Sequence, residues 1–263
     1  MSINVGVIGA AGRMGIEVCK AIDEDPNLKL VAAVDPGHAG KVVDRATEHI
    51  SEQFTYSESV QALVDNNCSV SIDFTHLDVS KPNAKFCADN GIHAVIGTSG
   101  YTDSDIAELK EQFKSSNCLL APNFGITAVL LKHFCALAAP FFETAEIIEL
   151  HHDGKKDAPS GTAADIASAM AAASSDWAQD PTEVENIPGS RGARGAGGIP
   201  IHAVRMRGMT AHQEVIFGTT GQTMTLRQDS YDRQSFMPGV VLAANKVAEH
   251  PGVTVGLADY LGI

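Results

Sequence analysis

The sequence predicts an α/β protein of two domains: a parallel sheet covered by helices, over residues 1–125 and 236–263, and an α+β domain with an open mixed sheet, over residues 126–235. In the first half, short apolar runs alternate with helical patterns, and repeated β-α-β units with right-handed crossovers give a parallel sheet with helices on both faces. From residue 198 onward, strand-like runs follow one another across glycine turns, which is an antiparallel signature. A chain of 263 residues is long enough for two modest domains with real cores.

The first β-α-β unit has the pattern of a dinucleotide-binding, Rossmann-like domain. Ile3–Ile8 is a β-rich run, Gly9–Gly15 is a glycine turn that opens a helix, and a second apolar run, Leu28–Val34, ends at Asp35. Glycines allow a tight turn, let backbone N–H groups approach a pyrophosphate and let helix and strand pack closely. A carboxylate about 20 residues further on can accept hydrogen bonds from ribose hydroxyls.

The glycine spacing of this motif is compatible with two interpretations. The pattern is G-x-x-G-x-x-G, with Ala11 where the commoner fingerprint has its second glycine, so a glycine turn without a ligand is the alternative to a cofactor loop. Asp35 would repel a 2′-phosphate, and Pro36-Gly37 supplies no arginine to bind one, so we expect a preference for NADH over NADPH. Arg13 and Lys41 are the residues that could still bind the phosphate.

The rest of the first half continues the alternation. Further strands are expected at Val70–Thr75, His93–Ile96 and Leu119–Ala121, and helices at Val79–Asp89 and Asp103–Ser115, the last with Thr102 and Asp105 as a capping pair. Ligands bind such sheets beyond the carboxyl ends of the strands. The residues expected to contact the dinucleotide are therefore Gly9, Ala10, Ala11, Gly12, Arg13, Met14, Asp35, Phe74, Gly97, Thr98, Ser99, Ala121, Pro122, Asn123 and Phe124. His76 is either a further contact or a solvated loop histidine.

The stretch Glu149–Thr162 concentrates the polar chemistry of the second half. After an apolar helix over Ala128–Ala139, a strand is expected to run into this stretch, and an Ala-rich helix from Ala163 to leave it, with Ser160 as its cap. A helix N-terminus near an ammonium group suits a carboxylate, and a histidine can deliver a proton near neutral pH. We therefore expect an anion-binding, proton-donating site in which the Ser160 hydroxyl and the N–H groups of Gly161 and Thr162 bind a carboxylate.

Two histidines in succession also raise other possibilities. His151 and His152 point to opposite faces of a strand, so both can serve one ligand only if the strand ends between them. A metal site is the obvious rival, but adjacent histidines lack the spacing of zinc ligands and Asp153 and Asp157 do not complete a set, so no metal is expected. Ser160 follows a proline and is not in a G-x-S-x-G elbow, which disfavours serine hydrolase chemistry.

The remaining second half predicts a loop, a sheet and a returning helix. Gly189–Gly198 is a basic glycine-rich loop that either closes over an anion or is merely solvated. Runs at residues 199–207, 212–217 and 222–228 imply a meander or open sheet, whose uncovered face either lies in solvent or forms an oligomer interface. A helix from Met237 is expected to return to the first domain, and Gly252–Ile263 to be a short tail.

Composition narrows the class of partner and the compartment. A formal net charge of −13 opposes nucleic acid and anionic membranes as partners, because both need a basic footprint. Five cysteines without a C-x-x-C pair suggest buried, reduced thiols. The beginning of the sequence has no signal-peptide pattern, and no run approaches the ~18 apolar residues of a membrane span. We therefore expect a soluble, cytoplasmic protein.

The whole chain resembles the 4-hydroxy-tetrahydrodipicolinate reductase (dihydrodipicolinate reductase) family of lysine and diaminopimelate biosynthesis. The resemblance is carried by Glu149–His152 with Lys155 and Asp157–Thr162, and by the loops Gly9–Gly15, Gly97–Gly100 and Ala121–Phe124. It implies NAD(P)H-dependent reduction of a cyclic dicarboxylate, with loss of water, in a homotetramer assembled through the carboxyl-terminal sheets. It also implies that His151 is the proton donor or acceptor, Lys155 a second proton donor, and His152, Gly161 and Thr162 substrate contacts.

The chain departs from the family pattern in two places. Ser99 stands where a second threonine is commoner in the G-T-T-G loop, and Lys156 follows the signature lysine, so Lys155 is assigned by spacing alone. Two other functions remain as alternatives: a non-catalytic redox sensor that binds NADH, and a reductase of another small dicarboxylate imine. A sensor would have no need of a proton donor beside an anion site.

Overall fold

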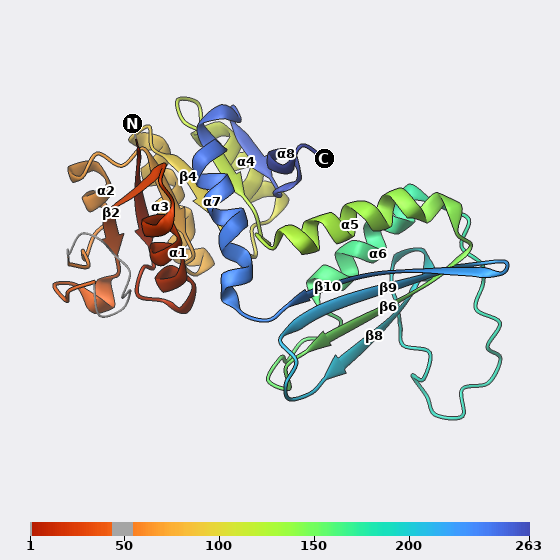
Figure 1. The fold of residues 1–263 in the computed structure, drawn as a ribbon. Helices are drawn as coiled ribbons and strands as arrows, with labels where there is room; N and C mark the ends of the chain where they lie inside the picture. The colour runs from red at the N-terminus through yellow and green to blue at the C-terminus, as the bar shows by residue number, and fades with distance from the viewer. Residues whose placement is uncertain (1, 44–54) are drawn as a thin grey trace. The chain divides into compact units, whose positions relative to one another are not determined.

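The computed structural model describes residues 2–43 and 55–263 (Figure 1). The chain divides into two compact units, one containing the described residues up to Gly125 together with Phe236–Ile263, the other containing Ile126–Ser235. Each unit has its own cluster of buried apolar side chains. No helix in the described part is long and apolar enough to cross a bilayer.

The first unit is built on a six-stranded sheet in which every paired neighbour is parallel. Its order is β11-β5-β4-β3-β1-β2, with strands β1 (Ile3–Ile8), β2 (Leu28–Val34), β3 (Val70–Asp73), β4 (His93–Ile96), β5 (Cys118–Leu120) and β11 (Val253–Val255). The chain moves one way from β1 to β2 and the other way from β3 to β5, so the direction reverses between β1 and β3. Such a reversal opens the crevice at the carboxyl ends of the strands where α/β sheets bind ligands.

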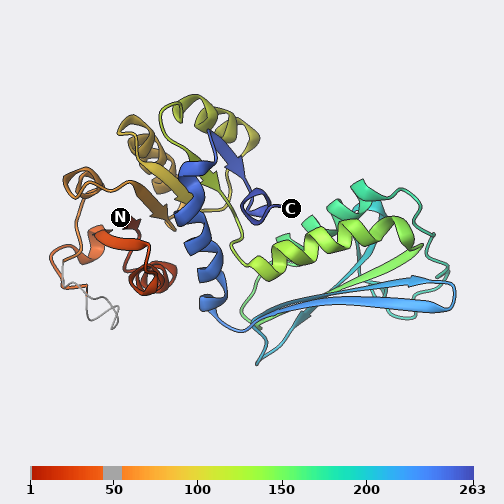
Figure 2. The ribbon, with the colours of Figure 1, turned by 45° about the horizontal axis from the view of Figure 1, so that its top comes forward.

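Helices cover both faces of this sheet, as the alternation predicted. They are α1 (Arg13–Glu24), α2 (Gln61–Asp65), α3 (Leu77–Asp89), α4 (Asp103–Gln112), α7 (Met237–Lys246) and α8 (Ala258–Leu261). Right-handed crossovers taken in opposite directions put α1 on one face and α3 and α4 on the other. The returning helix α7 packs beside α1 (Figure 2). The predicted capping box at Thr102 and Asp105 starts α4.

One sequence expectation for this unit was wrong. Gly252–Ile263 was expected to be a short tail, but β11 pairs with β5 at the edge of the sheet and α8 follows it. The strand is only three residues long and is bounded by Gly252 and Gly256, both at positive φ, so its periodic signal is too short to read from the sequence.

The second unit is a five-stranded mixed sheet with two helices on one face (Figure 1). Its elements are α5 (Ile126–Ala138), β6 (Thr144–His151), α6 (Gly161–Ala173), β7 (Ala193–Arg194), β8 (Pro200–Arg205), β9 (Ala211–Thr219) and β10 (Gln222–Ser230). Helices α5 and α6 pack together, and residues such as Ile147, Ile166, Met170, Val215 and Phe217 form the core beneath them.

The strand order β10-β9-β6-β8-β7 confirms the open mixed sheet but not the meander. Strands β9 and β10 form the expected hairpin, whereas β8 does not pair with β9: β6 lies between them, antiparallel to β9 and parallel to β8. The sequence after residue 198 contains no sign of this insertion, because β6 lies some 50 positions earlier in the chain.

All five cysteines are free and buried, as expected of small apolar residues. Burial raises the pKa of the Cys19 and Cys68 thiols to about 12 and that of Cys87 to about 11. These thiols therefore stay protonated and unreactive near neutral pH.

Candidate active site

The carboxyl end of β6 positions the first part of the candidate site. The strand follows the period-two rule: Ala145, Ile147 and Glu149 are buried toward the helices, and His151 continues that face as the last residue of the strand. His152 lies beyond the strand end, exposed, and its carbonyl accepts a hydrogen bond from Lys155 N–H at 3.1 Å. The strand thus ends between the two histidines, which is the condition that lets both serve one ligand.

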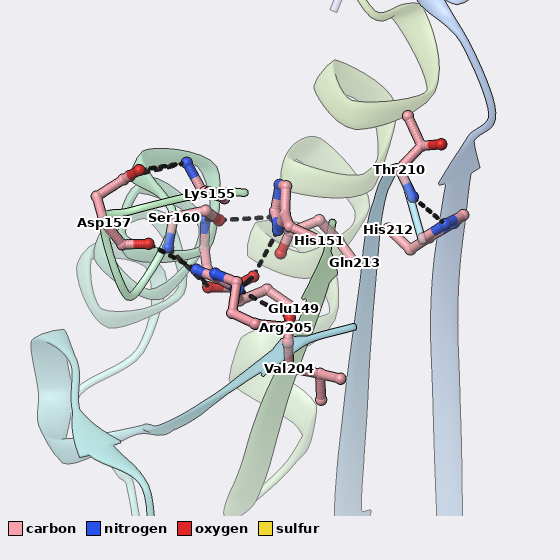
Figure 3. Close-up of polar contacts among 11 residues, drawn as sticks. Glu149, His151, Lys155, Asp157, Ser160, Val204, Arg205, Thr210, His212 and Gln213 are labelled. Atoms are coloured by element: carbon pink, nitrogen blue, oxygen red, sulfur yellow. Dashed lines mark hydrogen bonds and ion pairs between the residues drawn. The ribbon is translucent and has the colours of Figure 1, made fainter. Parts of the chain in front are cut away.

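Glu149 is the centre of this cluster of polar contacts (Figure 3). Its side chain is completely buried. Its carboxylate lies 2.5 Å from His151 Nδ1, accepts two N–H bonds from Arg205 at 2.7 and 2.8 Å, and accepts the Ser160 N–H at 2.9 Å. The parallel register of β6 and β8 places Arg205 directly beside His151. One carboxylate therefore connects β6, β8 and the start of α6.

Sequence reasoning missed both Glu149 and Arg205 as functional residues. A carboxylate at a core-facing position of a strand, two residues before His151, was the available signal for Glu149. For Arg205 there was none, since it lies 56 positions after Glu149 and reaches it only through the β6–β8 pairing.

Burial and hydrogen bonding oppose each other in the pKa values of this cluster. Burial raises the pKa of Glu149, but the hydrogen bonds from Arg205, His151 and the Ser160 N–H outweigh it, so the carboxyl pKa lies below its ordinary value. Burial lowers the pKa of His151; the Glu149 carboxylate raises it, and Lys155 and Arg205 lower it further, so the net direction is down. Glu149 is therefore an anion near neutral pH, and His151 gives up a proton readily.

The loop between β6 and α6 carries the predicted lysine. Lys155 Nζ donates to both carboxylate oxygens of Asp157 at 2.8 Å, and the lysine side chain is more enclosed than its partner, 21% against 65% exposed. Hydrogen bonding to Lys155 lowers the pKa of Asp157. The Asp157 carbonyl accepts an N–H from Arg205 at 2.7 Å, so the loop is attached to the Glu149 cluster.

Ser160 caps α6 as predicted, and its hydroxyl accepts the Ala163 N–H at 3.2 Å and a bond from Gln213 Nε2 at 3.0 Å. The side chain is only 3% exposed and faces the interior. Gly161, by contrast, is exposed, with open space where a side chain would be. The surface of the helix start that a ligand can reach is therefore the backbone of Gly161 and Thr162. A contact of the Ser160 hydroxyl with substrate stays a prediction.

The glycine loop of the first unit has the close contacts that a nucleotide cradle requires. A Cβ on Gly15 would lie 2.1 Å from the Gly9 carbonyl oxygen, and Gly9 itself has φ +77°. The Ala11 N–H donates to Asp35 Oδ2 at 3.2 Å, so the carboxylate after β2 also anchors the loop. Helix α1 begins at Arg13 without a side-chain cap, which leaves its first N–H groups for an anion. These residues fit a dinucleotide.

The loops after β3, β4 and β5 lie against one another, as their place at one edge of the sheet predicts. The Phe74 ring lies where a Cβ on Gly97 would be, at 2.1 Å, and packs against Phe124 with ring centroids 5.6 Å apart. Thr98 Oγ1 donates to the Thr75 carbonyl at 2.9 Å. Asn123 Oδ1 accepts the Gly125 N–H at 2.8 Å, so the structure assigns its carbonyl oxygen to the turn itself.

Asp73, at the end of β3, was not predicted as a site residue. It is 3% exposed and accepts bonds from the Thr75 N–H at 2.7 Å, the Thr75 hydroxyl at 2.6 Å and Asn83 Nδ2 at 2.9 Å. Burial raises its pKa against these hydrogen bonds. Its position next to the predicted contact Phe74 gives it the task of fixing that loop.

The basic loop Gly189–Gly198 is paired internally. Arg191 binds Glu146 at 2.5 Å and Asp180 at 3.0 Å, and Arg194 also contacts Asp180. Its two arginines are therefore neutralised by acids of the same unit and do not form an unpaired basic patch. Among the residues that the structure describes, no group of three His, Cys, Asp or Glu side chains is arranged to hold a metal ion.

Comparisons with known proteins match both halves of the chain. Residues 3–124 match the family model described as dihydrodipicolinate reductase, N-terminus, and residues 127–261 match dihydrodipicolinate reductase, C-terminus. The chain is 45% identical over 267 residues to 4-hydroxy-tetrahydrodipicolinate reductase of Corynebacterium urealyticum, covering 99% of both chains. It is 46% identical over 266 residues to the protein of the same name from Mycobacterium sp. strain KMS, covering 99% of this chain and all of the relative.

Solved structures show the same likeness. A dihydrodipicolinate reductase from Paenisporosarcina sp. TG-14, solved with dipicolinate bound, matches with a TM-score of 0.86 and 38% identity over 98% of this chain and 99% of the other. An amine dehydrogenase from Mycobacterium smegmatis, covering 97% of this chain and 95% of its own, has a TM-score of 0.65 but 14% identity, and shows only that the fold is shared more widely.

Proposed function

Because the chain belongs to the dihydrodipicolinate reductase family, we propose that it reduces 4-hydroxy-tetrahydrodipicolinate to tetrahydrodipicolinate, with loss of water, in cytoplasmic diaminopimelate and lysine biosynthesis. The observation that carries the proposal is the cluster at the end of β6, where His151 lies against a buried, ionised Glu149 close to the open start of α6. Five buried free thiols support a reducing compartment.

The residues divide the chemistry between them. A bound reduced nicotinamide supplies the hydride. Loss of the hydroxyl as water takes up one proton, and the neighbouring ring carbon releases one as the double bond forms. The hydride and one further proton then complete the reduction, so that one proton is consumed overall. His151, through Nε2, and Lys155 are the two groups that deliver the protons. His152 and the N–H groups of Gly161 and Thr162 bind the carboxylates of the substrate, because a helix start favours anions.

The test is to generate the proposed substrate freshly with the preceding enzyme of the pathway and to follow NADH absorbance, against a control without substrate. Steady NADH consumption that depends on this substrate supports the proposal. Binding of NADH without turnover would favour a redox sensor, and turnover of a different cyclic imine alone would replace the substrate.

We propose NADH as the preferred cofactor. The Asp35 carboxylate already accepts the Ala11 N–H and lies 2.9 Å from His38 Nδ1, so a 2′-phosphate would meet a negative charge at the end of β2. Asp35→Asn keeps an oxygen for Ala11 but removes the charge. We expect it to raise kcat/KM for NADPH relative to NADH about tenfold, equivalent to about 1.4 kcal/mol. A wild-type enzyme that prefers NADPH would contradict this assignment.

We also propose that the uncovered face of the second sheet assembles a homotetramer. Ile148, Leu150, Val204 and Ile216 lie half-buried on the face opposite α5 and α6, and such apolar surface is usually covered by a partner. Ile148→Lys should dissociate the tetramer in sedimentation or light-scattering measurements, since a charge buried without a partner is costly. Ser168→Lys, on the exposed side of α6, should not. A monomeric wild-type protein would rule the assembly out.

A further inference from the structure

A buried acid is hydrogen-bonded to an arginine and to a histidine at the end of β6, and this arrangement indicates a role other than substrate binding. Resting on the reductase function proposed above, we propose that Glu149, with Arg205 as its counter-ion, is a positioning residue. It fixes the orientation of the His151 ring and its tautomer, with the permanent hydrogen on Nδ1. Nε2 is then the atom that donates the proton. Neither side chain has to touch the substrate for this task.

The first step of the argument is the hydrogen bond itself. His151 Nδ1 and Glu149 Oε2 are 2.5 Å apart. An ionised carboxylate can only accept, so the hydrogen in this bond belongs to Nδ1. The other ring nitrogen, Nε2, therefore carries the proton that His151 gains and loses. A neutral acid at position 149 could donate a hydrogen to Nδ1 instead, and the tautomer of the His151 ring would then no longer be fixed.

The second step is how a completely buried carboxylate stays ionised. An isolated carboxylate out of water would take up a proton. Arg205 prevents this with two N–H bonds at 2.7 and 2.8 Å, in the forked geometry that matches a carboxylate, and the Ser160 N–H adds a third donor at 2.9 Å. Arg205 is thus the residue that keeps Glu149 a hydrogen-bond acceptor.

The third step is what else the same pair holds. Arg205 also donates to the carbonyls of Val204 at 2.9 Å and Asp157 at 2.7 Å. Asp157 in turn holds the Lys155 ammonium through its carboxylate. The Glu149–Arg205 pair therefore links His151 on β6 to the loop that carries the second proposed proton donor and to the start of α6 (Figure 3).

The chain supplies its own control. On the opposite face of the same strand, Glu146 accepts a bond from Arg191 at 2.5 Å and lies 2.6 Å from His202 Nε2. The three residue types are the same, but Glu146 is 33% exposed while Glu149 is fully buried. Glu146→Gln therefore removes the same charge from the same strand without touching His151.

The direction of the pH effect follows from the charges around His151. The Glu149 carboxylate raises the pKa of His151, whereas burial, Lys155 and Arg205 lower it. Removing the carboxylate leaves only the lowering influences from the groups that face the ring. A proton donor must be protonated to act, so the decline of kcat with rising pH should begin at a lower pH in Glu149→Gln.

The test compares Glu149→Gln with Glu146→Gln. We expect Glu149→Gln to lower kcat by more than about tenfold, to move the kcat–pH profile to lower pH and to leave KM for NADH unchanged. Glu146→Gln should keep the wild-type profile. An unchanged pH profile in a folded Glu149→Gln would overturn the proposal. If that variant fails to fold because Arg205 is left unpaired, the double variant Glu149→Gln/Arg205→Met removes both charges and is measured in its place.

A second measurement needs no turnover. In ¹⁵N-histidine-labelled wild-type protein, the neutral His151 ring should carry its hydrogen on Nδ1, with the signal assigned by its loss in His151→Gln. A neutral ring with its hydrogen on Nε2 would contradict the positioning role. Wild-type protein with the expected ring signature but no reductase activity would instead count against the proposed function, so the two failures can be told apart.

Discussion

Replacing His151 with alanine is expected to lower kcat by about 10²–10⁴-fold, the usual contribution of a positioned general acid. His151 lies half-buried at the end of β6, with its Nδ1 2.5 Å from the Glu149 carboxylate. Because the removed interaction is one made in the transition state, kcat and kcat/KM should fall together. Steady-state kinetics with saturating NADH measures this directly.

His152 provides the contrast. It lies outside the strand and is exposed, so His152→Ala should raise KM for the substrate more than it lowers kcat. In the wild type, kcat/KM should also decline as pH rises through a His151 pKa that lies below the ordinary value for histidine, and His151→Ala should lack this decline. Wild-type turnover in His151→Ala would remove the residue from the mechanism.

Features that depend on neighbouring residues were predictable from the sequence. Gly9, Gly15 and Asp35 specify a β-α-β unit through local turn chemistry and spacing, and the structure shows the close glycine approach that this pattern requires. The hydrogen bond from the Ala11 N–H to Asp35 is a further contact that the pattern did not predict. Ser160 as the cap of α6 was also readable, because a cap and its helix are adjacent in sequence.

Features that depend on pairing between distant segments were not predictable. Arg205 reaches Glu149 only because β8 pairs in parallel with β6, and the sequence does not reveal which strands are neighbours. For the same reason the insertion of β6 beside β9 was missed. Strand β11 beside β5 was missed because three residues give too short a periodic signal. Glu149 is the exception, because the strand periodicity alone places this acid on the core-facing side. An acid in that position needs buried partners, even though the sequence does not say which residues they are.

Lys155→Ala is expected to lower both kcat and kcat/KM, by about 10²-fold or more, because it removes the proposed second proton donor together with a positive charge that would attract the proposed dicarboxylate substrate. The structure gives a reason to choose Lys155 over the lysine that follows it. Lys155 is held by both oxygens of Asp157, whose backbone is attached to the Glu149 cluster through Arg205. Its ammonium therefore has a fixed place beside the site, whereas Lys156 is exposed.

Lys156→Ala is accordingly the matched control, since it removes the same side chain one residue along. It should keep kcat near the wild-type value and change KM only slightly, because an exposed charge acts weakly through solvent. Full activity in Lys155→Ala together with a large loss in Lys156→Ala would reverse the assignment. Equal losses in both would mean that the loop needs its total charge and that neither ammonium is the proton donor. The comparison separates a positioned acid from a general electrostatic attraction of the substrate.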